Sequence, residues 1–254
     1  MSLQTVIYGP DGEQLEQHSV AQHRLGTQLI LPDARVFRYC KAAAALGGLM
    51  RAAINSNYAP GCTGHANEDG FEGAPSAAVA AGGVSVTFAD TTARAKDYYQ
   101  DGYLVTYPSG HYQMQRIRSS DVGAGTTVTV YLEEELTTAI TTSTGLTAYL
   151  SPYSAVKAGM STNQYYEAFV CVPPRPVTSG YYFWGQVRGP CGITPHGGTW
   201  PGSAANYRDV FFWIDGTIDP SSVADPTSGY QRAGYLLSST VSSYGDLFVY
   251  LQLD

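Results

Sequence analysis

The sequence predicts a mainly β protein, built as one or more antiparallel sandwich or barrel-like domains with an extended N-terminal arm and long loops. The 254 residues include 28 Gly, 14 Pro and 20 Tyr, but only 14% are charged. This composition favours strands and turns over solvated helices. Short apolar or alternating segments recur between turn residues, as in antiparallel folds. No segment keeps a helical apolar period over about 20 residues.

The first third of the chain gives the weakest strand signals. Residues 1–30 are polar and without a clear period, with a GPDG turn at 9–12, so we expect an extended arm. In residues 31–56, VFRY indicates a strand, while KAAAAL has high helix propensity and predicts a short helical turn between extended pieces. The Gly- and Pro-rich stretch 57–76 predicts a long surface loop.

From Gly83 onward the strand signals are clear. Alternation and turn spacing predict strands in VSVTF, DYYQDGYLVTY, HYQMQRIRS, TTVTVYLE, LTAYL, YYEAFVCV, YYFWGQVRG, DVFFWIDG, AGYLLSS and DLFVYLQLD. In HYQMQRIR, the residues at 112, 114, 116 and 118 share one face and those at 113, 115 and 117 the other. We therefore expect that strand to be half buried.

The stretch SGYYFWGQVRGPCG, residues 179–192, places four aromatic residues in succession. Tyr181 and Phe183 share one face of a strand, and Tyr182 and Trp184 share the other. Gly185 allows a close approach by a neighbouring chain segment. Two interpretations stay open: the strand is central in its own sandwich, or one face packs on the core and the other against another subunit.

The expected organisation has three parts. Residues 1–30 form the arm, 31–172 a β-rich domain, and 173–254 a β-rich C-terminal half that is a second domain or continues the first. The rigid stretch Pro173-Pro174-Arg175-Pro176 marks the division if there are two domains.

Charge and cysteine usage limit the partners. A net charge of −7 and the lack of a basic run argue against nucleic acid. No apolar run approaches the length of a membrane span, and the first residues lack a signal-peptide pattern, so we expect a soluble, unsecreted protein. The cysteines have no C-x-x-C spacing and are interpreted as reduced, buried thiols, with a disulfide open in an oxidising medium: Cys40, Cys62, Cys171 and Cys191.

Motifs for catalysis or metal binding are incomplete. HGGTW at 196–200 is typical of an esterase oxyanion loop, but the chain has no G-x-S-x-G nucleophile elbow, P-loop or dinucleotide fingerprint. Glu133, Glu134 and Glu135 alternate in direction on a strand and do not form a facing carboxylate pair. Two pairs, Cys62 with His65 and Cys191 with His196, lack zinc-site spacing, and Asn67-Glu68-Asp69 lacks the EF-hand pattern. We expect no enzyme activity, metal or cofactor.

Several segments, taken together and in order, resemble the capsid decoration or cement proteins of tailed bacteriophages. They are His23-Arg24-Leu25-Gly26-Thr27, the Arg35 to Tyr39 strand, Tyr99-Gln100-Asp101-Gly102-Tyr103-Leu104, TVTVYLEEELTTAI with PYSAV, SGYYFWGQVRGPCG and the closing QRAGYLLSSTVSSYGDLFVYLQLD. The matches run from about residue 16 to residue 254. Residues 57–76 and TPHGGTWPGSAANYR fit the resemblance poorly.

The resemblance implies a mostly β virion protein on the capsid surface, assembled in the host cytoplasm, that stabilises the capsid by bridging major capsid subunits without catalysis or cofactor. We expect major capsid protein as partner and self-association, with a trimer as the expected form. Candidate interface residues are His23, Leu25, Phe37, Tyr39, Tyr99, Asp101, Tyr103, Tyr182, Trp184 and Trp200. A receptor- or carbohydrate-binding β module, and another head or tail structural protein, stay open as alternatives.

Overall fold

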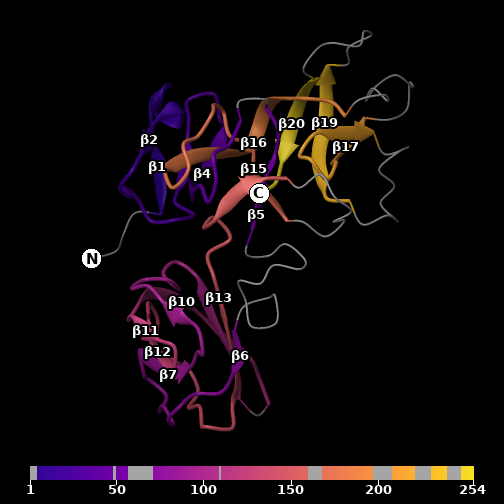
Figure 1. Ribbon diagram of the computed structural model, residues 1–254. Coiled ribbons are helices and arrows are strands. Elements are labelled where there is room, and N and C mark those ends of the chain that lie inside the picture. The colour runs from indigo at the N-terminus through magenta and orange to yellow at the C-terminus, as the bar shows by residue number, and fades with distance from the viewer. Residues whose placement is uncertain are drawn as a thin grey trace. The chain divides into compact units, whose positions relative to one another are not determined.

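The protein is described from a computed structural model, in which residues 5–47, 50–56, 71–108, 110–159, 168–196, 208–220, 230–238 and 247–254 are placed. The chain forms two compact units (Figure 1). Unit 1 contains Met1–Pro60 and Tyr153–Asp254, and unit 2 contains Gly61–Pro152. The mainly β, largely antiparallel architecture predicted from the sequence is confirmed.

Unit 1 is organised around a 9-stranded sheet with the order β1-β3-β4-β16-β20-β19-β17-β18, and β2 also pairs with β16. A separate 3-stranded sheet has the order β14-β5-β15. The elements of unit 1 are β1 (Val6–Tyr8), the 3-10 helix η1 (Glu13–Leu15), β2 (Gln17–His18), β3 (Gln28–Ile30), β4 (Val36–Lys41), β5 (Ala53–Asn55), β14 (Val156–Ala158), β15 (Phe169–Cys171), β16 (Tyr182–Ile193), β17 (Asp209–Phe212), β18 (Ile218–Pro220), β19 (Arg232–Ser238) and β20 (Leu247–Gln252).

The aromatic stretch becomes β16, a 12-residue strand at the centre of the large sheet. It lies antiparallel to β4 along one side, with Trp184 opposite Tyr39. Its other side pairs first with β2, through Tyr182 and His18, and then with β20, through Ile193 and Leu247. Because a central strand has both sides paired, β16 links the N-terminal and C-terminal parts of unit 1 into one sheet.

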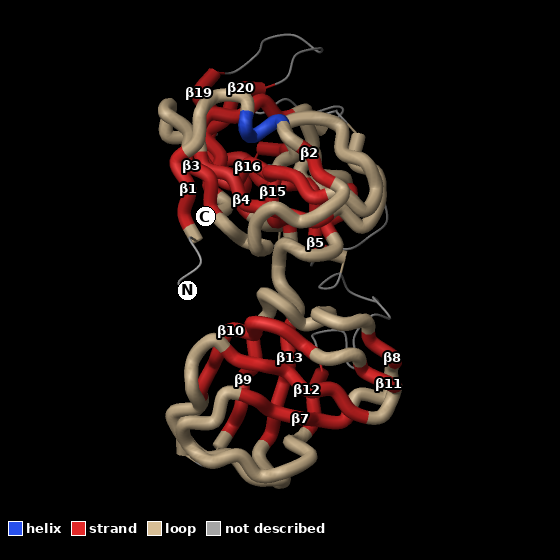
Figure 2. Tube along the Cα trace, turned by 90° about the vertical axis from the view of Figure 1, so that its left-hand side faces the viewer, coloured by secondary structure: helices blue, strands red, loops and turns tan. Residues whose placement is uncertain are grey.

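Unit 2 is a barrel-like sheet (Figure 2). The 6-stranded order is β6-β13-β9-β10-β12-β7, and a bridge between Pro75 and Phe88 joins the segment after β6 to the opposite edge strand. The strands are β6 (Phe71–Gly73), β7 (Ser85–Ala89), β9 (Tyr103–Tyr107), β10 (Gln113–Ser120), β12 (Thr127–Leu132) and β13 (Gly145–Tyr149), with the 2-stranded pair β8 (Ala93–Arg94) and β11 (Gly123–Ala124).

Two local predictions are wrong. The expected helical turn in KAAAAL does not form, because the backbone N–H groups of Ala42, Ala43 and Leu46 donate to carbonyls of residues 181, 156 and 177 instead of to their own segment. Helix propensity is a weak preference that such long-range pairing overrides. The predicted loop 57–76 contains β6, whereas residues 57–70 lie outside the described part of the chain.

The division into units also differs from the expected boundaries at residues 30 and 172. Unit 2 is an insertion, so unit 1 is made of two segments separated by 61–152. Residues 5–30 include the 3-10 helix η1 and contribute β1, β2 and β3 to the large sheet. The Pro-rich stretch lies within unit 1, where the N–H of neighbouring Val172 donates to the carbonyl of Gln186 at 2.8 Å.

Candidate functional site

The aromatic face of β16 gathers many of the residues singled out from the sequence. Trp184 lies against Tyr39 of β4 with ring centroids 4.8 Å apart, and the Tyr182 ring stacks on Tyr39 at 5.8 Å. Aromatic pairs at such separations stabilise beyond the area they bury. The apolar cluster that holds these rings also contains Leu25, Leu29, Leu31 and Phe37.

The N-terminal segment of the same chain covers this aromatic face. The centroid of the His23 ring lies 5.2 Å from the ring centroids of both Tyr39 and Trp184. The backbone N–H of Gln22 donates to the Tyr39 hydroxyl at 3.1 Å. Trp184 is consequently only 2% exposed within the single chain. The opposite face of β16 is buried too, with Phe183 in a cluster that includes Cys40 and Cys171. Both faces of the aromatic strand are therefore covered without a second subunit.

The electrostatics of this cluster are those of a packed core. Burial lowers the pKa of His23, which keeps the imidazole neutral at pH 7, and burial raises the pKa of the Tyr39 hydroxyl. The Lys41 ammonium lies 5.3 Å from the centroid of the half-buried Tyr182 ring. A cation at that position interacts with the ring face and stays near solvent.

In unit 2, Tyr99 is part of a buried polar network. Its hydroxyl donates to Asp90 at 2.8 Å, and Arg94 Nε donates to the same carboxylate oxygen at 2.9 Å. Burial opposes ionisation of Asp90, but hydrogen bonds from the Thr92 N–H, Arg94 and Tyr99 outweigh it and lower the carboxyl pKa. Tyr99 is thus a core residue whose polar end holds this network together.

The other two unit 2 candidates lie around the turn before β9. Asp101 is buried, adopts a φ of 61°, and has its carboxylate Oδ1 3.5 Å from Arg116 Nη2. Tyr103 is half-buried on the outer side of β9. Trp200 lies outside the described residues, as do Cys62, His65 and the 67–69 segment. Four of the described candidates therefore keep partly exposed surface: His23, Leu25, Tyr103 and Tyr182.

No metal-binding arrangement emerges in the part of the chain that the structure describes. No group of three or more His, Cys, Asp or Glu side chains there could hold a metal ion. Burial raises the pKa of the Cys191 thiol to about 12, which disfavours the thiolate that would bind zinc. His196 packs its ring 4.7 Å from Trp213. Within the same ranges, no helix is long and apolar enough to cross a membrane.

One apolar surface was not singled out from the sequence: the outer side of β19 and β20, here called the β19–β20 face. Phe248 is 48% exposed and Leu237 is 41% exposed, and Tyr235 stacks on Tyr250 with centroids 5.3 Å apart. The Met50 side chain borders this face at Gly192, which pairs with Phe248. The sequence predicted a strand in DLFVYLQLD, but it did not show that the exposed side is aromatic over two strands.

A second apolar surface lies on the outer side of unit 2, here called the β9–β10 face. Tyr112 is 77% exposed and Met114 is 62% exposed. The Tyr107 and Tyr112 rings meet edge to face, with their centroids 5.0 Å apart. The buried side of the same strand carries Gln113 and Gln115. This strand thus reverses the usual arrangement, because its amides point into the barrel and its Met points outward.

The buried amide of Gln113 explains how that reversal is tolerated. Its Oε1 accepts hydrogen bonds from Thr137 N, Thr137 Oγ1 and Thr138 N at 2.9–3.2 Å, while its Nε2 donates to the Thr138 carbonyl at 2.9 Å. A buried polar group with its partners in place costs little. The half-buried strand predicted from HYQMQRIR is confirmed, and the side that faces inward is the amide side.

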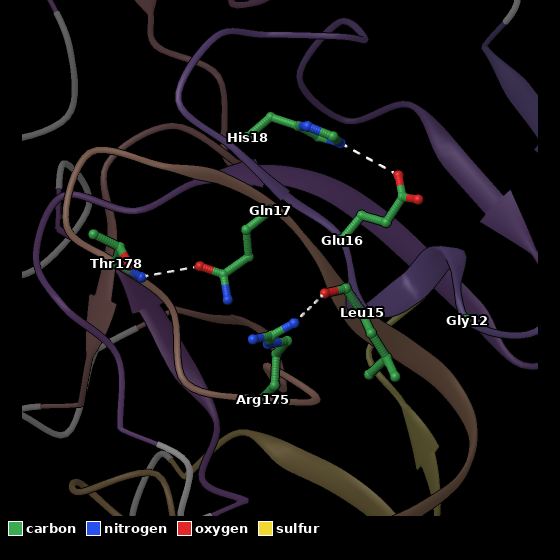
Figure 3. Close-up of a pocket in the computed structure, with 7 residues that line it drawn as sticks. All are labelled: Gly12, Leu15, Glu16, Gln17, His18, Arg175 and Thr178. Atoms are coloured by element: carbon green, nitrogen blue, oxygen red, sulfur yellow. Dashed lines mark hydrogen bonds and ion pairs between the residues drawn. The ribbon is translucent and has the colours of Figure 1, made fainter.

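An open polar hollow lies where the N-terminal segment meets the Pro-rich stretch (Figure 3). Arg175 Nη1 donates to the Leu15 carbonyl at 2.9 Å, and the Thr178 N–H donates to Gln17 Oε1 at 3.1 Å. His18 and Glu16 lie at the rim, 3.3 Å apart. These contacts are between the lining residues themselves, and they fasten β2 to the segment that precedes β16.

Asp219 in β18 is the most unusual charged group of unit 1. It is fully buried, and neither carboxylate oxygen has a hydrogen-bond partner among the described residues. Burial raises the pKa of this carboxyl to about 6, although His196 opposes the shift. A carboxylate without a partner destabilises the folded state when it is ionised.

Comparison of the chain with protein-family models, with curated proteins and with solved structures finds no match in any of the three. The functional interpretation therefore rests on the fold and on the two apolar faces. Together they describe a mainly β protein with two units, each of which presents exposed aromatic and apolar side chains on the outer side of a sheet.

Proposed function

We propose that this protein is a structural component of a phage virion that binds the capsid exterior and stabilises it by bridging neighbouring major capsid subunits. The ordered resemblance to decoration proteins supplies the class of particle. The observation that carries the bridging role is that each of the two units has an exposed apolar face of its own. A protein that crosslinks two subunits needs two separate contact surfaces.

The composition of the two faces supports a role in protein contacts. Tyr, Phe, Met and Leu contribute the exposed area, and Tyr, Phe and Met are enriched at protein interfaces, where Lys and Glu are depleted. Arg232 lies at the border of the β19–β20 face, where its Nη2 donates to Asp209 Oδ1 at 2.7 Å and its Nη1 donates to Gln252 Oε1 at 2.7 Å. An apolar centre with a polar border is the usual arrangement of a binding surface.

Two faces on one chain also explain how weak contacts add up. When one unit is bound, the second binds from a high local concentration, which raises the overall affinity by about 10²–10⁴ without new contacts. The binding free energy adds to that of the assembled lattice, because a ligand that binds only the assembled state stabilises it. The net charge of −7 suits a position outside the capsid, away from the negatively charged genome.

The test is the copy number of the protein in an intact particle, before and after mild chaotrope. We expect a copy number comparable to that of the capsid protein, selective release by the chaotrope, and a particle that is less stable to heat after release. A few copies per particle would move the protein to the tail or neck and would contradict the decoration role. Chemical crosslinking of the released protein tests the expected trimer.

A carbohydrate-binding role is the second candidate, and the exposed Tyr107 and Tyr112 pair favours it. Aromatic rings of this kind can stack on sugar faces. Glycan-array binding by the isolated protein that is lost in Tyr112→Ser would support this alternative. Absence of glycan binding together with a high copy number in the particle would leave the capsid-bridging role.

A further inference from the structure

Two buried cysteines of unit 1 lie next to each other. Cys40 in β4 and Cys171 in β15 have their sulfur atoms 4.0 Å apart, and both residues are fully buried. They are free thiols in this structure, as is Cys191. The expectation of buried cysteines is confirmed for these three residues, but the proximity of two of them was not predictable from their spacing.

The surrounding backbone holds the two cysteines in this position. Cys40 lies opposite Phe183 in the β4–β16 register. The end of β15 is fastened to the same strand by a pair of hydrogen bonds of 2.8 Å between Val172 and Gln186. A Cβ atom at Gly185 would lie 2.4 Å from Cys171 Sγ, so the absence of a side chain at Gly185 provides the room for that sulfur.

The two cysteines also lie on opposite sides of the insertion. Cys40 belongs to the segment of unit 1 before unit 2, and Cys171 belongs to the segment after it, 131 positions along the chain. A covalent link between them would join the two segments directly. It would close a loop that contains all of unit 2.

We propose that Cys40 and Cys171 are a latent disulfide site that fastens the two segments of unit 1 when the protein meets an oxidising medium. The oxidant is a small-molecule disulfide such as oxidised glutathione. One cysteine thiolate attacks oxidised glutathione, which forms a mixed disulfide and releases one glutathione as a thiol. The second cysteine then attacks the mixed disulfide and displaces the remaining glutathione as a thiol. Two protein thiols lose two electrons and two protons, and one small disulfide becomes two thiols. The sulfur atoms must approach to about 2 Å.

Burial controls when this bond forms. Burial raises the pKa of the Cys40 thiol, and only the thiolate reacts, so oxidation of the folded protein is expected to be slow. The bond forms during folding in the oxidising medium or during transient opening of unit 1. This inference concerns the chain itself and does not depend on the proposed capsid role.

The experiment uses the full chain carrying Cys62→Ser and Cys191→Ser, so that only the pair remains. The protein is equilibrated with a reduced and oxidised glutathione mixture, once folded and once during refolding from urea, so that access to the thiols is not limiting. We expect a mass loss of about 2 Da, two hydrogen atoms, no alkylation after denaturation, and one crosslinked peptide containing both cysteines. When Cys171→Ala is added to the same background, the mass loss, the protection from alkylation and the crosslinked peptide should all be absent.

The thermal midpoint of the oxidised protein should rise by about 10 °C over the reduced protein, because a long loop is closed in the unfolded chain. Dithiothreitol should return the midpoint to the reduced value. Two alkylatable thiols after refolding in the oxidising mixture, or stable glutathione adducts on the separate cysteines, would overturn the inference. An oxidised protein with an unchanged or lower midpoint would overturn the stabilising role.

Discussion

Replacement of Trp184 by Ala tests whether the chain itself covers the aromatic strand. Trp184 is 2% exposed and packs against His23 and Tyr39 at 5.2 and 4.8 Å. Truncation of a buried Trp costs about 3–5 kcal/mol, which includes the cavity left behind. A domain is stable by only about 5–15 kcal/mol. The variant should therefore lose about a fifth or more of the stability of unit 1.

The matched control is Tyr182→Ala in the same strand. Tyr182 is half-buried, so its truncation removes less contact area and should cost only about 1–2 kcal/mol. Urea unfolding followed by far-UV circular dichroism measures both costs, and hydrogen exchange in peptides from β4 and β16 assigns them to unit 1. Wild-type stability of Trp184→Ala combined with lost particle binding would refute the reasoning, since the Trp184 face would then be an intersubunit surface.

Three further predictions concern unit 1. Gly185→Ala should cost about 2 kcal/mol, because the new Cβ would lie 2.4 Å from Cys171 Sγ, whereas Gly47→Ala, with open space around it, should be nearly neutral in the same urea assay. The raised pKa of Asp219 means that its ionisation destabilises the fold, so stability should increase by up to about 3 kcal/mol as pH falls from 8 through 6 to 4. Asp219→Asn should flatten that part of the pH profile, and an unchanged profile would show that another group is responsible. Deletion of residues 1–31 should unfold unit 1, because Leu29 and Leu31 belong to the core over Trp184, while unit 2 keeps its hydrogen-exchange protection. A unit 1 that stays folded would show instead that residues 1–31 are an independent arm.

Local patterns predicted the strands well, because alternation and turn residues are local properties of the chain. The strands predicted in HYQMQRIRS, TTVTVYLE and DLFVYLQLD appear as β10, β12 and β20. The same patterns could not show which side of β10 faces inward. Gln113 is buried because loop groups at Thr137 and Thr138 satisfy its amide, and those partners are distant in sequence.

Long-range features were not predictable in the same way. Unit 2 is inserted into unit 1, so both ends of unit 2 are connected to unit 1. Local sequence patterns indicate only domains that follow one another along the chain. The cover over Trp184 comes from the polar N-terminal segment, in which His23 and Leu25 are isolated among polar residues. Several candidate interface residues were therefore core residues of one chain, and the exposed residues Phe248 and Met114 were not singled out.

The most direct test of the bridging role is binding of face variants to particles from which the protein has been stripped. Phe248→Ser alters the β19–β20 face and Tyr112→Ser alters the β9–β10 face. The matched controls, Val20→Ser and Val122→Ser, replace exposed apolar residues outside the two faces, one in each unit.

All variants should fold, since each altered side chain is exposed, and thermal unfolding checks this. Cosedimentation with stripped particles should show about tenfold weaker binding for each face variant, no binding for the double variant, and wild-type binding for both controls. Wild-type binding by the double face variant would contradict the account.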